Sequence, residues 1–183
     1  MLFSFFDPIT YQGKTTTDIY RNYRAYFDRA LAGFKIKTYY IVGSPRPEML
    51  ANELYGNTQL YWVLLMLNNT YDPFWGWIQN QEACYQYAIQ KYSEVGGENQ
   101  VIYHVDSKGE KYYNLTNYED APDIWYDKGD KNKLYPQFVG SLAPITPLED
   151  QVLQNEERRQ IKIIDPNDMP QFINTFVREM EKA

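Results

Sequence analysis

The chain has 183 residues, of which 44% are hydrophobic and 23% charged, a composition typical of a globular protein and not of a disordered one. Its net charge of −6 argues against general affinity for nucleic acid or for an anionic membrane. A single cysteine excludes an internal disulfide framework and fits assembly in a reducing cytoplasm. The N-terminus lacks the pattern of a signal peptide, so we expect no secretion.

Aromatic residues are unusually frequent, with 18 Tyr, 9 Phe and 4 Trp. Tyr and Trp combine an apolar body with a polar tip, and they are enriched where protein surfaces meet. With one His and one Cys, this composition indicates an interface protein more than an enzyme. A core rich in tyrosine is the alternative.

Residues 1–38 are expected to form an N-terminal arm with one helix. Phe3, Phe5 and Phe6 are not expected to remain in water, so this segment should dock on its own domain or on a partner. Apolar residues at helical spacing predict the helix, which begins at Thr17 or Asp18 and continues to about residue 31.

Residues 39–95 are expected to form a small module and a following helix. Aromatic and β-branched residues favour a strand over 39–42, which the loop Gly43-Ser44-Pro45-Arg46-Pro47 ends. Two helices follow, one stopped by Gly56 and one over 57–67 that is apolar on every side. An aromatic return over 71–77 completes the module, and another helix is expected from about residue 80 to 93.

The order strand, helix, helix and return resembles the LysM module, a βααβ unit best known for binding peptidoglycan and chitin. The match lies in the pattern Y-x-V, a loop, L-A-x-x-x-Y-G and an apolar helix that ends in Asn. It implies an α+β fold with a LysM-like βααβ module. LysM modules usually carry a Gly-Asp-Thr-like loop that builds part of the sugar groove, and residues 43–47 replace it here. We therefore expect negligible binding to sugars.

Residues 96–147 are expected to form a hairpin and an irregular extension. Strand-forming residues over 101–105 and 111–115 flank a turn, which predicts the hairpin. The stretch 119–147 is rich in Asp, Gly, Pro and aromatic residues and has little periodicity, so we expect it to be irregular, and either functional or ordered only by a partner.

Residues 148–183 are expected to form a C-terminal arm of helix, strand and helix. The pattern Thr146-Pro147-Leu148-Glu149 is a capping box that predicts a largely exposed helix to about residue 160. A short strand follows over 161–164. Apolar residues at helical spacing from Met169 to Met180 then predict a strongly amphipathic helix.

Candidates for catalysis or for metal binding are few. His104 is the single histidine, which excludes a multi-histidine metal site within one chain. Four acidic residues of the stretch 120–130 could in principle hold a hard cation, but a solvated acidic loop fits better because lysines are interleaved. These are Asp120, Asp123, Asp127 and Asp130. Glu48, Glu53 and Glu82 carry no pattern that pairs them as in a glycosidase. We expect no enzyme activity, no cofactor and no metal.

The whole chain resembles one family. The stretches that carry the resemblance are MLFSFFDPI, TDIYRNYRAYFDRALAG, TYYIVGSPRPEMLANELYGNTQLYWVLLMLNNTYDPFWGWI, WYDKGDK and RRQIKIID. They are similar to the baseplate wedge protein (gene product fifty-three) family of T-even-like, contractile-tailed phages.

The resemblance implies a structural subunit of the virion tail baseplate, present in sixfold copies and assembled in the host cytoplasm. Its implied role is to link neighbouring wedges into a ring around the hub. The implied partners are other wedge subunits, the products of genes six, seven and twenty-five, with no nucleic acid and no membrane. The alternatives are a LysM-type peptidoglycan-binding module of a tail-associated lysin and a muralytic enzyme.

Ten residues are expected to contact partners. They are Phe3, Phe5, Phe6, Arg46, Trp75, Trp77, Trp125, Tyr126, Phe172 and Phe176. The phenylalanines lie in the two arms, and we expect at least one arm to dock on a neighbouring subunit, as amphipathic helices dock in grooves. The competing possibility is that both arms fold back on their own module.

Overall fold

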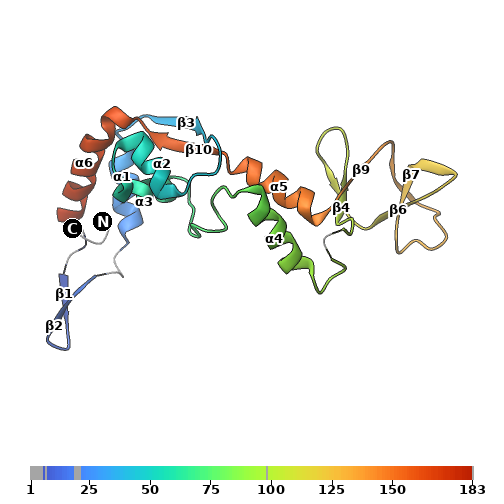
Figure 1. Cartoon of the computed structure of the whole chain (residues 1–183), viewed down its shortest axis with the longest axis horizontal. Helices are drawn as coiled ribbons and strands as arrows, with labels where there is room; N and C mark the ends of the chain where they lie inside the picture. Colours follow the sequence, from blue (N-terminus) through green and yellow to red (C-terminus); the bar gives the residue numbers. More distant parts are fainter. Residues whose placement is uncertain (1–5, 7, 19–21, 98, 183) are drawn as a thin grey trace. The chain divides into compact units, whose positions relative to one another are not determined.

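A computed structural model describes residues 6, 8–18, 22–97 and 99–182 of the chain (Figure 1). The protein contains helices and strands, which confirms the α+β class. The chain divides into two units, Met1–Gln79 with Glu156–Ala183, and Asn80–Asn155. The division into four segments expected from the sequence stays a prediction.

The first unit contains both termini of the chain. Its elements are, in chain order, β1 (Pro8–Tyr11), β2 (Lys14–Thr17), α1 (Tyr23–Leu31), β3 (Ile36–Tyr40), α2 (Pro47–Tyr55), the 3-10 helix η2 (Thr58–Leu60), α3 (Tyr61–Leu67), β10 (Gln160–Ile164), the 3-10 helix η3 (Pro166–Asp168) and α6 (Met169–Glu181). Helix α2 starts with a proline and ends at Gly56, whose φ of 65° is the left-handed conformation that glycine adopts easily. Asn57 caps η2 by accepting a hydrogen bond from the Gln59 amide at 2.9 Å.

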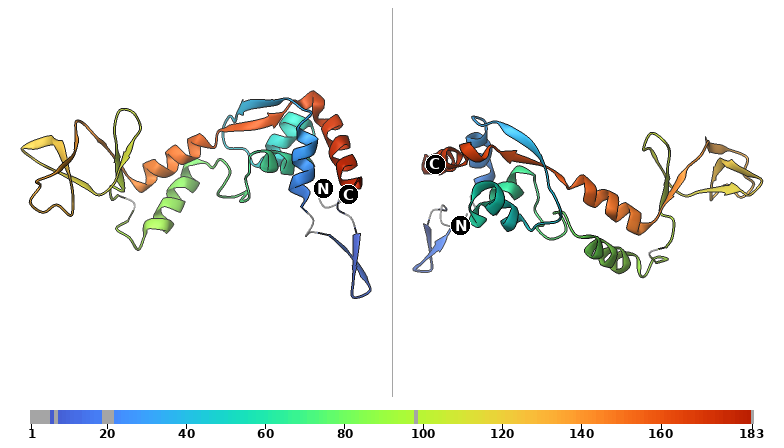
Figure 2. Two further views of the ribbon diagram at one scale, coloured as in Figure 1. Left: turned by 180° about the vertical axis from the view of Figure 1, so that it is seen from behind. Right: turned by 45° about the horizontal axis from the view of Figure 1, so that its top comes forward.

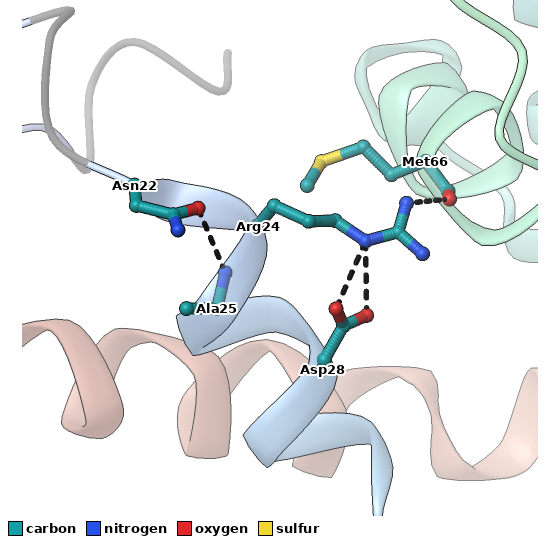
Figure 3. A network of polar contacts seen from close by, with 5 residues as sticks. All are labelled: Asn22, Arg24, Ala25, Asp28 and Met66. Carbon is teal, nitrogen blue, oxygen red and sulfur yellow. Dashed lines mark hydrogen bonds and ion pairs between the residues drawn. The ribbon is translucent and has the colours of Figure 1, made fainter.

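Helix α1 begins later than the sequence predicted. Residues 14–17 form strand β2, since three consecutive threonines favour an extended backbone. The side chain of Asn22 caps α1 by accepting a hydrogen bond from the Ala25 amide at 3.3 Å (Figure 3). The prediction of a helix start at residue 17 or 18 is therefore wrong, and the hairpin of β1 and β2 was not predicted.

Arg24 joins α1 to the end of α3. Its Nε lies 3.0 and 3.1 Å from the two carboxylate oxygens of Asp28, and its guanidinium donates to the backbone carbonyl of Met66 (Figure 3). Arg24 thus stabilises the first unit by connecting two of its helices.

Helix α3 lies between two apolar clusters, as its all-round hydrophobicity predicts. Trp62, Val63 and Leu67 pack with residues of α1 and α6, whereas Leu64 packs in a second cluster with Ile161. Each fully buried large side chain stabilises the fold by roughly 1.5–3 kcal/mol relative to exposure. The short helix is therefore the centre of the core.

Helix α6 packs against α1 (Figure 2). Phe172 and Phe176 are 0% exposed, and Phe27 of α1 contacts both rings, at centroid distances of 5.2 and 6.1 Å. The amphipathic stripe predicted for this segment is confirmed. This stripe is buried against α1 of the same chain.

The strand that pairs with β3 comes from the far end of the sequence. Antiparallel β10 places Gln160 opposite Tyr40 and Ile164 opposite Ile36. Residues 71–77 form turns and no strand, so the expected return over these residues is wrong. The strand predicted over residues 39–42 is β3 over residues 36–40, because these are the residues that pair with β10.

The second unit contains short strands flanked by helices. Its elements are α4 (Gln81–Tyr92), β4 (Tyr103–Val105), β5 (Lys111–Tyr112), β6 (Leu115–Tyr118), β7 (Ala121–Asp127), β8 (Pro136–Val139), β9 (Ala143–Ile145) and α5 (Pro147–Glu157), whose last residues belong to the first unit. The strands form two antiparallel sheets of order β5-β4-β9 and β6-β7-β8. The pairing of β4 with β5 confirms the predicted hairpin.

The irregular stretch predicted over 119–147 is wrong, because it holds β7, β8 and β9. Two of its aspartates shape the connection between β7 and β8. Asp127 Oδ1 accepts a hydrogen bond from the Gly129 amide at 2.7 Å, and Asp130 Oδ2 accepts one from the Tyr135 amide at 2.9 Å.

Helix α5 has the predicted capping box, in which the Thr146 amide donates to Glu149 at 2.8 Å. The helix is not largely exposed, because Asp150, Gln151 and Asn155 are buried. Asp150 accepts a hydrogen bond from the Tyr103 hydroxyl at 2.5 Å, which explains why a carboxylate tolerates that position.

Candidate interaction surfaces

Two loops of the first unit are joined through Trp77. Its indole N–H donates a hydrogen bond to the backbone carbonyl of Pro45 at 2.9 Å, and the ring is 3% exposed. This contact places the loop after β3, which includes the exposed Arg46, beside residues 71–77. Trp77 therefore positions a surface, while its own ring lies in the core.

Residues 71–75, here called the aromatic loop, are shaped by Asp72. Its Oδ1 accepts hydrogen bonds from the amides of Phe74 at 2.9 Å and Trp75 at 3.1 Å, and its carbonyl accepts one from the Gly76 amide at 2.9 Å. A Cβ at Gly76 would lie 2.6 Å from that carbonyl oxygen, so no larger residue fits without movement. The side chain and the carbonyl of Asp72 therefore hold the loop in a tight turn.

This conformation turns rings outward. Tyr71 is 87% exposed, Phe74 is 75% exposed and Trp75 is 45% exposed. Rigid aromatic side chains contribute most to protein–protein binding, because they bury a large area at a small cost in conformational entropy. The loop therefore has the chemistry of an anchor for a partner protein. Of its three rings, only Trp75 was predicted from the sequence to contact a partner. The Asp72-Pro73 turn signal beside Tyr71 and Phe74 could have indicated the other two.

Trp125 and Tyr126 of β7 are partly buried in the second unit. The Trp125 indole N–H donates to the Gly140 carbonyl at 2.9 Å, and its ring lies 4.6 Å from that of His104. Tyr126 packs edge-on against Tyr118, with ring centroids 6.1 Å apart. Both rings stabilise the sheet of this unit.

Three exposed apolar residues of the second unit lie within β8 or directly before it. They are Leu134, Tyr135 and Val139, with exposures of 65%, 72% and 70%, and they are here called the β8 segment. They were not predicted from the sequence, because no strand was expected in this stretch; of the three, only Val139 lies within β8 itself.

The phenylalanines of the arms divide into three cases. Phe3 and Phe5 lie outside the described residues. Phe6 is partly buried and stacks on Tyr23 with ring centroids 3.4 Å apart. Phe172 and Phe176 are core residues of the first unit, so in this structure the C-terminal arm folds back on its own chain and offers neither ring to a partner.

The titratable residues singled out in the sequence are dispersed. Glu48 and Glu53 are exposed on α2, and Glu82 belongs to the other unit. Burial, with a smaller effect of Lys128, lowers the pKa of His104, whose Nδ1 has no hydrogen-bond partner within the described ranges. Among the described residues, no group of three or more His, Cys, Asp or Glu could hold a metal ion.

A shallow pocket of about 450 Å³ lies between η2 and the start of α6. It is lined by Tyr55, Asn57, Gln59, Leu60, Trp62, Pro166, Met169, Pro170, Ile173 and Asn174. None of these residues is a carboxylate, a histidine or a cysteine. No helix within the described part of the chain is both long and apolar enough to span a membrane.

The chain is similar to phage baseplate proteins along its length. The family model described as base plate wedge protein 53 matches residues 1–179. The chain is 58% identical to baseplate wedge protein gp53 of Enterobacteria phage T4 over 192 residues, which cover 100% of this chain and 97% of the T4 protein.

Proposed function

Because the chain belongs to the base plate wedge protein 53 family, we propose that it is a structural subunit of a phage tail baseplate wedge and links neighbouring wedges during assembly around the hub. The observation that carries this proposal is the 58% identity to the T4 protein over the whole chain. Its place is then the tail baseplate of the virion.

Two separate surfaces support a linking role. A linker must bind at least two neighbours, and each unit of this chain has exposed apolar groups of its own. They include the aromatic loop in the first unit and the β8 segment in the second. Large exposed apolar side chains gathered in one region commonly mark interaction sites. We assign one neighbour to each surface, and we expect the neighbours to be subunits of the gene product six, seven and twenty-five types in a sixfold ring.

A LysM-like arrangement is part of the proposal for the first unit. The order β3, α2, α3 and β10, with β3 and β10 antiparallel, supports a βααβ module in which residues 68–159 separate the second helix from the second strand. In this proposal the module is a scaffold that carries the rest of the chain.

The hydrogen bonds of the loop after β3 favour a scaffolding role for the module and not a sugar-binding one. The Pro45 carbonyl accepts from Trp77, and the Ile41 and Gly43 carbonyls accept from the Arg159 guanidinium at 2.8 and 2.9 Å. Backbone acceptors that could have held a sugar hydroxyl are thus already occupied by the chain.

The proposal is tested by mixing purified wedge subunits with and without this chain. We expect closed rings, measured by sedimentation and electron microscopy, only when the chain is present. The double variant Tyr71→Ala/Phe74→Ala should keep the wild-type melting temperature and lose ring formation. Val95→Ala, at an exposed residue outside both surfaces, is the matched control and should assemble normally. Rings that close equally well without the chain would contradict the proposal.

A further inference from the structure

The sheet of β3 and β10 has two outer edges, because it consists of these two strands (Figure 1). The Ile41 amide donates a hydrogen bond to the carbonyl of Arg159, the residue directly opposite, at 2.9 Å. In an antiparallel pair, positions that exchange hydrogen bonds alternate with positions that do not. The backbone N–H and C=O groups of Ile36, Thr38 and Tyr40 therefore point away from β10, toward the outer edge of β3.

The outer edge of β10 is already satisfied by the first unit. The side chain of Asn68 bonds to both the N–H and the C=O of Lys162, and the Tyr55 hydroxyl donates to the carbonyl of Ile164. The outward groups of β3 have no such partner in the parts of the chain that the structure describes. The three residues that carry them are exposed. The outer edge of β3 is here called the open edge.

The open edge lacks the usual protection. Proteins commonly protect such an edge with a proline, a bulge or a charged residue. Its outward residues Ile36, Thr38 and Tyr40 are uncharged, and the register with β10 has no bulge. Their side chains share the outer face of the sheet, since the intervening Tyr39 and the following Ile41 pack into the core. Two large apolar side chains therefore lie along this edge.

The sheet itself has an excess of positive charge. Residues 35–42 and 160–165 contain three basic groups and one acidic group. Lys37 pairs with the acidic one, Asp165. Lys35 and Lys162 have no ion pair with any residue that the structure describes. Lys162 lies opposite Thr38, so its side chain shares the outer face with the open edge. A strand added beyond β3 would lie about 10 Å from β10, which a lysine and a carboxylate can span across the short threonine.

We infer that the open edge of β3 pairs with an extended segment of another baseplate subunit, which has a carboxylate facing Lys162 and apolar side chains beside Ile36 and Tyr40. The inference rests on the proposed function and assigns a contact within it. The segment would accept the N–H groups of Thr38 and Tyr40 and donate to their carbonyls, as in other cases of strand addition.

Symmetry and charge both select a different protein over a second copy. Antiparallel pairing of β3 with β3 of another copy creates a two-fold axis. Neighbouring copies in the proposed sixfold ring are related by a sixfold rotation, so their contacts join different surfaces. Self-pairing would also bring two positively charged sheets together without supplying a carboxylate, which is unfavourable. An acidic segment complements the unpaired Lys162.

The first test compares Thr38→Pro with Thr38→Val in the full-length chain. Proline is tolerated in a strand where the N–H faces solvent, so Thr38→Pro should keep the pairing with β10 while it removes a donor from the open edge. Thr38→Val is the matched control, because it keeps that donor. The probe is baseplate wedges assembled without this chain, and binding is measured by co-sedimentation. We expect Thr38→Pro to bind about tenfold more weakly than the wild type, and Thr38→Val to bind within about twofold of it.

The second test leaves the backbone of β3 unchanged. Lys162→Glu reverses the charge beside the open edge and should weaken wedge binding at least about threefold, with a smaller loss at high salt. Lys108→Glu, at an exposed lysine of the second unit, is the control and should bind like the wild type. In the wild-type chain, the amides of Thr38 and Tyr40 should exchange their hydrogens more slowly when the chain is bound to wedges than when it is free.

Amide exchange at Thr38 and Tyr40 that stays as fast in the bound chain as in the free one would overturn the inference, even if Thr38→Pro failed to fold. Unchanged binding by a folded Thr38→Pro, or by Lys162→Glu, would also overturn it. Dimerisation of the wild-type chain that Thr38→Pro abolishes would assign the edge to a second copy. If the wild-type chain closed wedges into rings without protection of these amides, the inference would fail while the proposed function stood. A wild-type chain that did not bind wedges would remove both.

Discussion

The side-chain amide of Asn68 forms two hydrogen bonds with the backbone of Lys162, 94 residues further along the chain. Its Oδ1 accepts from the Lys162 N–H at 2.7 Å, and its Nδ2 donates to the Lys162 carbonyl at 2.9 Å. Nδ2 also donates to the Leu64 carbonyl at 2.8 Å. The side-chain amide has one donor and one acceptor, like a peptide group. Asn68 therefore pairs with the Lys162 N–H and C=O as a neighbouring strand would, and it connects the end of α3 to β10.

Replacing Asn68 by aspartate is therefore expected to be costly despite the equal size. The carboxylate cannot donate, and it would face the carbonyls of Leu64 and Lys162. We expect Asn68→Asp to lower the free energy of unfolding by about 2 kcal/mol at neutral pH, measured by urea denaturation. Asn69→Asp, at the exposed next residue, is the matched control and should change it by less than about 0.5 kcal/mol. Equal losses in the two variants would contradict this role for Asn68.

Substitutions at Phe176 and Phe74 should affect stability and partner binding separately. Phe176 is 0% exposed and Phe74 is 75% exposed. Phe176→Ala should reduce the free energy of unfolding by about 3–5 kcal/mol, because it removes a large core side chain and leaves a cavity. Phe74→Ala should change it by less than about 0.5 kcal/mol while weakening binding to wedges. Thermal and urea denaturation measure the first effect, and co-sedimentation measures the second. A Phe176→Ala protein that unfolds like the wild type would show that α6 is not part of the core.

Tyr55 should make the stability of the first unit depend on alkaline pH. Burial raises the pKa of Tyr55 from 10.0 to about 12. Between these values the unfolded chain loses the proton and the folded chain keeps it. The stabilisation that Tyr55 provides is therefore complete below pH 10 and decreases as the pH rises toward 12. The decrease should reach roughly 2 kcal/mol.

Tyr55→Phe isolates this effect. The variant loses one long hydrogen bond, in which the hydroxyl donates to the Ile164 carbonyl at 3.3 Å, so at about pH 8 it should be at most about 1 kcal/mol less stable than the wild type. Near pH 11.5 it should be the more stable of the two in urea denaturation. Tyr71→Phe, at an exposed ring, is the control and should keep a constant difference from the wild type. A constant difference for Tyr55→Phe would contradict the prediction.

Gly76→Ala tests the tight shape of the aromatic loop. The added methyl group would lie 2.6 Å from the Asp72 carbonyl oxygen, so the loop must open. We expect a loss of about 1–3 kcal/mol in the free energy of unfolding and weaker wedge binding. Gly33→Ala provides the comparison, since its added Cβ would meet no atom within 4 Å. That variant should be as stable as the wild type or more stable by up to about 1 kcal/mol. Similar behaviour of the two variants would show that the loop is not constrained at Gly76.

Features that depend on neighbouring residues could be predicted from the sequence. The limits of α2, with its first proline and Gly56, follow from rules that act within one helical turn. The same holds for the capping box at Thr146 and for the apolar stripe of α6. The family resemblance was likewise carried by contiguous stretches of sequence, and the match of the family model to residues 1–179 confirms it.

Partnership between distant segments was decided only by the tertiary structure. An amphipathic stripe shows that a helix face will be buried but not what buries it, and here Phe27 of α1 covers Phe172 and Phe176. The pairing of β10 with β3 joins segments whose local patterns contain no reference to each other. The outward direction of Tyr71 and Phe74 follows from the backbone of a turn. Local propensity acts over a few residues, whereas which apolar faces and strand edges meet is settled by packing the whole chain at once.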